Sequence, residues 1–435
     1  MFADIVDKTL KEGRDAELYV RRLEDYPVIF EANNLKSVKS RIIQGYSLRA
    51  IKDDRLGFAS STNISGDKED KLIKSALSSC QYGPDAKYSF WKGKRFPSPN
   101  VFHPATVSFE IEDSASLGRQ IVKRLSDMIP EAYIDVKIGR SFEEITHITS
   151  SFERIYYKSL FYLFATALLV REGQLLYINE GYSGCGIPEK PFSLVGEIAW
   201  KEKLSQKSLE VESKKMPVIF TPKAMDILIE PLVSGLLGRN ITSKSSPLTD
   251  RLGEEVLDPR FSLYDDALMD LAVGSSPFDD EGVPRQRFPL YNKGILKNYF
   301  LDIANAHQLE MESTASAVRG FLLQPSAGPS NLHLEPGEVS YDEMVEDLEE
   351  GLIVDQVIGA GQSNLLNGEF SVNVELGFLV KNGKIQGRVR NTMIAGNVYE
   401  LLKNNILAIG KDVEFSNNLI TPHVCLKDIS VSGKG

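Results

Sequence analysis

The chain has 435 residues, of which 42% are hydrophobic and 25% charged, as in an ordinary globular protein with a large core. This length favours two domains over one. Its 60 acidic residues outnumber its 50 lysines and arginines, and the net charge of −10 argues against a nucleic-acid partner, because phosphate backbones are bound by clustered cations.

The cysteines and the apolar runs indicate a cytoplasmic protein. Cys80, Cys185 and Cys425 are odd in number and far apart, which favours free thiols in a reducing compartment. The N-terminal segment contains acids and lacks an apolar h-region, so it does not resemble a signal peptide. The longest nearly apolar run, residues 160–170, is too short to cross a bilayer. We therefore expect no membrane association.

The first half of the chain is expected to form an antiparallel meander with a few helices. Phe2, Ile5 and Leu10 lie on one face of a short N-terminal helix, and Asp53-Asp54 marks a turn between two strands. Alternating apolar residues predict strands at 16–21, 26–31, 47–52, 56–59, 134–138, 145–150, 154–157, 161–171 and 175–179. Further helices are predicted at 67–80, 114–128 and 192–212, and residues 84–104 are typical of a long surface connection.

Two features of this half suggest chemistry but have simpler explanations. His147 stands alone within a predicted strand, which favours a structural role over metal binding. Residues 181–186, GYSGCG, do not have the G-x-S-x-G spacing of a nucleophile turn, and no His or Asp is nearby. We interpret that segment as a flexible loop.

The second half is predicted to be a different kind of sheet. A polar run at 212–215 precedes a strand at 217–220, and the boundary placed there gives domains 1–210 and 211–435. Asn292-Lys-Gly294, Asn367-Gly368 and Asn382-Gly383 suit turns that need positive φ, so this sheet is expected to be rich in hairpins. One helix interrupts it, with a capping box at Ser340 and Glu343 and with Met344, Leu348 and Leu352 on one face. The expected fold class is α+β, with two domains, largely antiparallel or mixed sheets and flanking helices.

Residues 221–246 contain the helix on which the functional interpretation depends. Thr221 suits the N-cap and Pro222 the first helical position, and an apolar stripe follows as far as Leu236. On the polar face, Glu230 is followed by Pro231, and Gly235 stands where a second side chain would face the same site. The helix offers no His, Cys or paired carboxylate, so we expect it to carry no reaction and no metal.

No other local motif for a metal or cofactor is present. The five histidines are scattered, and H-E-x-x-H, EF-hand, P-loop and dinucleotide patterns are absent. The densest polar segment is residues 278–283, FDDEGV, whose adjacent carboxylates could raise one another's pKa for acid–base work. We favour the alternative that Asp279 and Glu281 accept backbone hydrogen bonds and shape a tight turn at Gly282.

The order of several motifs adds a family resemblance. Residues 276–283, SPFDDEGV, and 290–296, LYNKGIL, resemble signatures of the TldD/PmbA family, first labelled modulators of DNA gyrase. In the first half, GYSLR at 45–49 and GFASST at 57–62 resemble the family's G-x-x-x-R … G-F-x-x-T segment. Further segments follow in the family's order at 312–314, 359–361, 368–371, 392–397 and 409–412, so the resemblance spans nearly the whole chain.

This resemblance implies that the helix within residues 221–246 corresponds to the zinc-binding helix of the family. TldD-type members are peptidases with H-E-x-x-x-H on this helix, where two His bind zinc and the Glu activates its water. The surrounding pattern places those positions at Glu230, Pro231 and Gly235, so the ligands and the base are missing, and we expect Pro231 to disturb the helix. The Cys that completes the metal site has no clear counterpart, because Cys425 falls in what reads as the final strand. The chain therefore resembles the PmbA (TldE) branch, with no catalytic residue, no metal and no cofactor of its own.

Two functional hypotheses remain open. The first is a non-catalytic subunit that joins an H-E-x-x-x-H homologue in a heterodimeric zinc peptidase and helps enclose an unfolded peptide. The second is a stand-alone homodimer that binds peptides or has undetected hydrolase chemistry. In either case the loop residues Asp279, Glu281, Gly282, Ser313 and Thr314 could contact substrate or only support the fold. Ala315 departs from the family's usual S-T-G at this loop.

Overall fold

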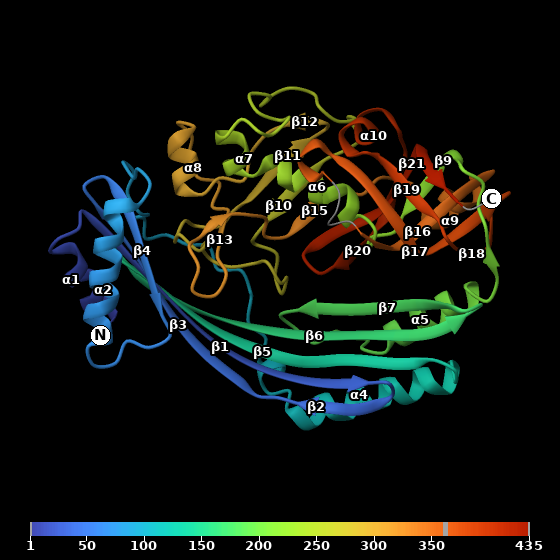
Figure 1. The fold of residues 1–435 in the computed structure, drawn as a ribbon, viewed down its shortest axis with the longest axis horizontal. Coiled ribbons are helices and arrows are strands. Elements are labelled where there is room, and N and C mark those ends of the chain that lie inside the picture. The colour runs from blue at the N-terminus through green and yellow to red at the C-terminus, as the bar shows by residue number, and fades with distance from the viewer. Residues whose placement is uncertain (1, 360–363, 434–435) are drawn as a thin grey trace.

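The computed structural model describes residues 2–359 and 364–433, so Ala360 and Gly361 of the 359–361 segment lie outside the described residues. Two large β-sheets with helices packed against them make up the fold, which confirms the predicted α+β class (Figure 1). In the part of the chain that is described, no helix is both long and apolar enough to cross a membrane.

The first sheet is antiparallel and has the order β4-β3-β1-β5-β6-β7, with β2 paired to β1. Its strands are β1 (Asp15–Glu31), β2 (Asn34–Val38), β3 (Arg41–Lys52), β4 (Arg55–Ser61), β5 (Tyr133–Thr149), β6 (Glu153–Arg171) and β7 (Gln174–Gly184). Several predicted strands merge into longer ones. The polar residues 22–25 were expected to separate two strands, but pairing with β3 on one side and β5 on the other keeps β1 continuous. Residues 181–184, expected in a loop, belong to β7.

Helices cover both ends of this sheet (Figure 1). They are α1 (Phe2–Leu10), α2 (Lys68–Ser79), the 3-10 turn η1 (Cys80–Tyr82), α3 (Pro104–Val107), α4 (Ile111–Met128) and α5 (Ser193–Leu204). α1 and α2 pack over the β1–β3–β4 end, and α4 and α5 cover the β5–β7 side. The connection at 84–104 is not merely superficial, because Ala86, Tyr88 and Phe90 are buried against the sheet.

The second sheet is mixed, with β9 parallel to β16 and β15 parallel to β21 among mostly antiparallel pairs. Its strands are β8 (Ser208–Leu209), β9 (Lys214–Phe220), β10 (Leu263–Asp266), β11 (Arg287–Asn292), β12 (Ile295–Leu296), β15 (Leu332–Leu334), β16 (Glu350–Ile358), β17 (Glu369–Lys381), β18 (Lys384–Val389), β19 (Met393–Asn397), β20 (Ile406–Ser416) and β21 (Leu419–Ser432), while β13 (Ala317–Val318) and β14 (Ser326–Ala327) form a separate hairpin. The hairpins predicted at Asn292-Lys-Gly294 and Asn382-Gly383 are confirmed. At Asn367-Gly368 the positive φ is confirmed, with 77° at Gly368 between the antiparallel strands β16 and β17, but the turn is not a tight hairpin, because the 3-10 turn η3 (Leu365–Asn367) precedes β17.

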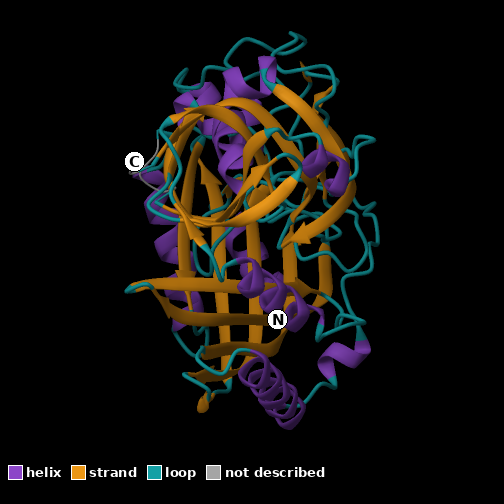
Figure 2. Cartoon of the chain, turned by 90° about the vertical axis from the view of Figure 1, so that its right-hand side faces the viewer, coloured by secondary structure: helices purple, strands orange, loops and turns teal. Residues whose placement is uncertain are grey.

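Figure 2 shows helices enclosed by curved strands in the upper part of the molecule, and the remaining helices pack mainly against the second half. They are α6 (Asp226–Leu236), α7 (Gly238–Thr242), α8 (Ile303–Gln308), α9 (Tyr341–Glu346) and α10 (Val398–Asn404). Of these, α8 also contacts the first half through Ile303 and Ala304. The capping box at Ser340 and Glu343 is confirmed, but α9 ends before Leu352, which lies in β16.

One hydrophobic core joins the two sheets. Phe161 and Leu163 of β6 belong to the same buried cluster as Ile353 of β16 and Phe378 of β17. At about 25 cal/mol per Å2 of apolar surface, such burial fixes the two sheets against each other. A cleft can therefore form between them only at their margins, where side chains no longer fill the space. The boundary at residue 210 stays a prediction.

Candidate functional site

The helix expected to hold the lost metal site begins later than predicted. α6 starts at Asp226, and Thr221 does not cap it, because its hydroxyl lies 3.0 Å from Asp355 Oδ1. The chain turns at Thr221 instead, whose carbonyl accepts from the amides of Ala224 and Met225. Pro231 does not end the helix, and the expectation that it disturbs the helix geometry stays a prediction. α6 runs through Pro231 without interruption, since only one backbone hydrogen bond is lost there and buried leucines on both sides hold the helix in the core.

The space beside Gly235 is already filled. A Cβ atom at this position would overlap the hydroxyl oxygen of Tyr399 and approach Leu248 Cδ1 to 3.1 Å. The Tyr399 hydroxyl donates to the carbonyl oxygen of Pro231 at 3.3 Å, which fixes the ring against α6. Glu230 is exposed, so it does not face this space. The residues present therefore do not fit the zinc site that the family resemblance implies.

No alternative metal centre replaces it within residues 2–359 and 364–433, where His, Cys, Asp and Glu side chains nowhere gather in threes in a metal-binding arrangement. Cys425 lies in β21, as predicted, and is 3% exposed. Burial raises the pKa of its thiol to about 12, so it remains protonated and packs as a small apolar residue.

The loop at residues 278–283 is a buried, hydrogen-bonded turn. Asp279 Oδ1 accepts from the amides of Glu281 and Val283, both at 2.9 Å, and Oδ2 accepts from the amide of Ala317 at 3.0 Å. Burial raises the pKa of the Asp279 carboxyl to about 7, an effect that Arg285 and these amides oppose. Gly282 has φ 78°, and a Cβ there would overlap the ring of His147. The geometry supports the turn-shaping interpretation for Asp279.

Glu281 makes a different contact, which the sequence did not indicate. Its Oε2 accepts from the amide of Ile303 at 2.7 Å, and its Oε1 lies 2.6 Å from Nη1 of Arg49. Arg49 also binds Glu17, which is completely buried and is contacted by Arg319 and His147 as well. Burial raises the pKa of Glu281 and Arg49 opposes this. The cluster lies at the junction of the two halves and is fully enclosed, so we assign it to the fold.

Ser313 and Thr314 are part of the same junction. The hydroxyls of both contact the carbonyl oxygen of Leu301, and Thr314 Oγ1 accepts from the Leu301 amide at 2.8 Å. Ala315 has φ 56°, a left-handed conformation in which the family's usual glycine costs less. The loop keeps this shape through Arg285, whose Nη1 donates to the Ala315 carbonyl at 2.6 Å.

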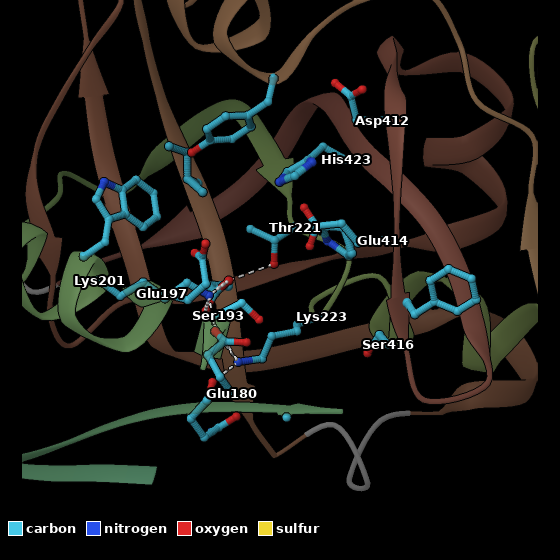
Figure 3. A pocket seen from close by; sticks show the side chains of 18 of the residues that line it. Glu180, Ser193, Glu197, Lys201, Thr221, Lys223, Asp412, Glu414, Ser416 and His423 are labelled. Atoms are coloured by element: carbon cyan, nitrogen blue, oxygen red, sulfur yellow. Dashed lines mark hydrogen bonds and ion pairs between the residues drawn. The ribbon is translucent and has the colours of Figure 1, made fainter. Parts of the chain in front are cut away.

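A cavity into which acidic and basic side chains converge lies elsewhere, between the margins of the two sheets. This cavity of about 720 Å3 is bordered by β6 and β7 of the first sheet, by α5, by β16, β20 and β21, and by residues 221–223 after β9 (Figure 3). Seven charged residues line it; they are Glu180, Glu197, Lys201, Lys223, Asp355, Asp412 and Glu414. Of these residues, only Asp412 was singled out from the sequence, as part of the family segment 409–412.

Four of these charges form a closed network at the base of the cavity. Lys201 Nζ lies 2.6 Å from Glu180 Oε1 and 2.8 Å from Asp355 Oδ2. Lys223 Nζ lies 3.2 Å from Glu180 Oε1 and also donates to the carbonyl oxygen of Asn179. Burial favours the neutral forms of these groups, but the attraction between the opposite charges is the larger effect. The pKa of Asp355 is therefore lowered and that of Lys201 is raised. Two ammonium groups thus neutralise two carboxylates.

Three further carboxylates, those of Glu197, Asp412 and Glu414, remain without a cation in the described structure. Partial burial raises the pKa of the Glu414 carboxyl, and the carboxylates of Glu197, Glu180 and Asp355 add to this, while Lys201 opposes it. The histidine in the cavity does not compensate, because burial lowers the pKa of His423 to about 4. At neutral pH the cavity therefore carries an excess of negative charge.

The cavity also meets the edges of two strands. Asn179, Glu180 and Gly181 are consecutive in β7, and Glu414, Phe415 and Ser416 are consecutive in β20. Successive residues of a strand point to opposite faces, so a cavity lined by three in a row must border the strand's edge. Among the described strands, β7 pairs only with β6 and β20 only with β21, although an isolated bridge joins Gly410 of β20 to Val339. Within the described residues, the backbone edge is therefore without a strand partner at 414–416 of β20 and along β7, where Lys223 already binds the Asn179 carbonyl oxygen.

Sequence reasoning missed this site because its residues come from segments spread over more than 200 positions. Two signals were nevertheless present. Lys201 follows Leu194 and Ile198 at helical spacing, so a lysine stands on the buried stripe of a helix, and Asp355 interrupts the apolar run of β16. A charge on a buried face needs a partner, although the sequence alone does not say which.

Comparison with known proteins agrees with the motif pattern. Residues 213–433 match the model of the PmbA/TldA metallopeptidase C-terminal domain, and residues 16–80 match domain 1 of the same group. Metalloprotease PmbA of Escherichia coli O157:H7 is 25% identical, with 96% of this chain and 92% of that protein covered. An uncharacterized protein of Methanocaldococcus jannaschii is 26% identical over 96% of both. The crystal structure of TldE from Thermococcus kodakarensis has a TM-score of 0.91 at 22% identity, covering 99% of this chain and all of that one.

Proposed function

This chain belongs to the PmbA/TldD metallopeptidase family, and we propose that within it the chain is the non-catalytic, TldE-like subunit of a zinc peptidase that acts on unfolded peptides. Family membership supports a role related to proteolysis. The further step, from family to subunit, rests on this chain's own residues. Its partner in the proposal is an H-E-x-x-x-H homologue from the same cell, and its location is the cytoplasm.

One observation carries the proposal, namely the Tyr399 ring in the space beside Gly235. Simple loss of the ligands would leave a gap next to α6, which a few substitutions could refill with a metal site. Here a hydrogen-bonded side chain from α10 occupies that space, so the helix packs as an ordinary core element. A chain built this way contributes to peptide cleavage by binding substrate, while another subunit supplies the metal.

The cavity between β7 and β20 is the surface to which we assign that binding. Extended peptides add to exposed strand edges through backbone hydrogen bonds, which makes such sites tolerant of sequence and selective for unfolded chains. A folded protein rarely offers an extended segment that can enter such a cavity, because its strands are held in sheets. The stretches of β7 and β20 that lack a strand partner at this cavity would therefore select an unstructured peptide.

The decisive experiment mixes this chain with the H-E-x-x-x-H homologue and follows cleavage of an unstructured peptide. We expect a complex on size-exclusion chromatography and faster cleavage than with the homologue alone. Thr166→Trp, which places a large side chain in the cavity, should keep the complex and reduce the stimulation. Lys137→Trp, on an exposed position of the neighbouring strand β5, is the matched control. Equal cleavage with and without this chain, and no complex, would refute the proposal.

The second candidate is a stand-alone homodimer that binds peptides. The same cavity supports it, because strand edges bind peptides whether or not a catalytic subunit is present. It becomes the better explanation if the chain elutes as a dimer, ignores the homologue and still binds an unstructured peptide in a way that Thr166→Trp abolishes.

A further inference from the structure

We propose that the cavity between β7 and β20 receives a positively charged side chain, that of a lysine or arginine, from an extended peptide. This inference rests on the proposed peptide-binding role and adds to it a substrate class. Three properties of the cavity carry the inference: its charge, its size and its walls.

The first property is the charge of the cavity. The cavity is lined by five carboxylates and two ammonium groups, and both ammonium groups are already held by Glu180 and Asp355 at its base. The carboxylates of Glu197, Asp412 and Glu414 therefore stand unneutralised around the same space, as Figure 3 shows. A cation entering here gains attraction without displacing an existing ion pair, whereas an anion would be repelled.

Size and spacing then decide the kind of cation. Throughout the described residues, no three acidic, histidine or cysteine side chains approach closely enough to hold one metal ion. A space of about 720 Å3 is also far larger than an ion needs, and corresponds to the volume of an organic group. An ammonium or guanidinium group on a long side chain can reach several separated carboxylates at once through its multiple donors.

The aromatic walls of the cavity suit the aliphatic stem of such a side chain. Trp200, Phe164 and Phe415 line the cavity and remain 43%, 37% and 60% exposed, an arrangement that leaves large apolar surface in contact with water. The aliphatic stems of lysine and arginine bury well against such surface, and their cationic heads are attracted to aromatic faces. The strand edges of β7 and β20 would hold the peptide backbone beside this pocket, so that one of its side chains enters.

The test compares two acetylated, amidated alanine–serine hexapeptides that differ at one central residue, arginine in one and citrulline in the other. Citrulline has nearly the same shape as arginine but no charge. Binding is followed by the fluorescence of Trp200 in a Trp91→Phe background, which leaves only the tryptophan that lines the cavity. We expect the arginine peptide to bind about tenfold more tightly than the citrulline peptide.

Substitutions in the cavity locate the effect. Glu414→Gln and Glu197→Gln should each weaken binding of the arginine peptide severalfold and leave the citrulline peptide unchanged. Both residues are exposed and without ion pairs in the described structure, so the variants should fold, which circular dichroism checks. Glu369→Gln, an exposed acid of β17 outside the cavity, is the matched control. Glu414→Lys should weaken binding of the arginine peptide further than Glu414→Gln does, because it adds a repelling ammonium group beside the two remaining carboxylates.

Each remaining outcome overturns the inference. It fails if the citrulline peptide binds as tightly as the arginine peptide, if neither binds at millimolar concentration, or if the Glu197→Gln/Glu414→Gln double variant keeps the charge preference. The mixing experiment with the H-E-x-x-x-H homologue reports separately on the proposed function. Stimulated cleavage without charge preference removes only the inference, and charge-selective binding without stimulation removes only the subunit role.

Discussion

Arg49 of β3 and Glu281 of the 278–283 loop form a buried ion pair, with 2.6 Å between Nη1 and Oε1, across a separation of 232 residues. On its other side Arg49 Nε donates to Glu17 Oε1 at 3.0 Å. The two residues belong to two sequence motifs, GYSLR and SPFDDEGV, that appeared independent in the sequence. Their contact gives both motifs one purpose, because it locks the first sheet onto the loops of the second half.

Replacing Arg49 by methionine should strongly destabilise the protein. The variant leaves Glu17 and Glu281 buried without their main cation, and breaking a buried pair in this way typically costs about 3–5 kcal/mol. Chemical denaturation should show this loss in the free energy of unfolding. Arg260→Met is the matched control, because Arg260 pairs with Asp258 at 2.7 Å while its side chain remains 54% exposed, and such pairs contribute less than about 1 kcal/mol. Similar losses for both variants would contradict the structural role of the Arg49 cluster.

Gly235→Ala should destabilise the protein, because the new methyl group would overlap the Tyr399 hydroxyl. Overpacking of this kind typically costs about 1–3 kcal/mol. The cost should shrink in the Gly235→Ala/Tyr399→Leu double variant, measured against Tyr399→Leu alone, since the ring that creates the conflict is gone. A double-mutant cycle from urea denaturation gives the coupling energy. Additive effects would show that Tyr399 does not fill the space beside α6.

The same conflict predicts the result of rebuilding the metal site. Glu230→His, Pro231→Glu and Gly235→His together should give at most weak zinc binding, because position 230 is exposed, Tyr399 occupies the space at 235 and no third ligand is present. Equilibrium dialysis with zinc followed by metal analysis measures this. About one tightly bound zinc per chain, in the triple variant but not in the parent, would refute the prediction.

The sequence predicted local structure well where one rule controls it. The turn at Asp53-Asp54 has positive φ at both residues, and the hairpin at Asn382-Gly383 follows from the same preference. Prediction from the sequence failed where strand pairing outweighs local polarity, as in the continuous strand β1. It also failed where a side chain bonds to a residue that is distant in the sequence. Thr221 had the right chemistry for an N-cap, but Asp355 of β16 binds its hydroxyl instead.

The candidate site shows a sharper limit. The loss of the zinc ligands at 230, 231 and 235 could be read directly, because it depends on residue identity at fixed spacing. The cavity could not, since its excess negative charge depends on which carboxylates Lys201 and Lys223 neutralise. That choice is made by the packing of β7, α5 and β16, and not by any local pattern.

Lys201→Met should cost more stability than Lys223→Met. Lys201 is 8% exposed and is the main partner of the buried Asp355, so its removal should leave an uncompensated carboxylate and cost about 3 kcal/mol or more. The Lys223 side chain is 26% exposed and lies 3.9 Å from Asp355, so water can replace much of its contribution. Urea denaturation of both variants decides this. Lys201→Met/Asp355→Leu should recover part of the loss, and no recovery would contradict the assigned pairing.

His423 should make the protein less stable as the pH falls through the mildly acidic range. Its ring contacts that of Tyr341 with centroids 4.5 Å apart, and burial lowers its pKa to about 4 from the ordinary value of 6.5. The unfolded chain therefore binds a proton at His423 from about pH 6.5 downwards, while the folded chain resists until about pH 4. Between these values the unfolded state binds more protons, so the free energy of unfolding decreases as the pH falls.

His423→Phe keeps the ring contact and removes the titration. Because carboxylates titrate equally in both proteins, the difference between them isolates the histidine. From pH 7 to pH 5 the parent should lose about 1–2 kcal/mol more than His423→Phe in urea denaturation. Parallel loss in the two proteins would show that His423 is already hydrated or protonated in the folded state, and that the upper wall of the cavity is more open to water than its packing indicates.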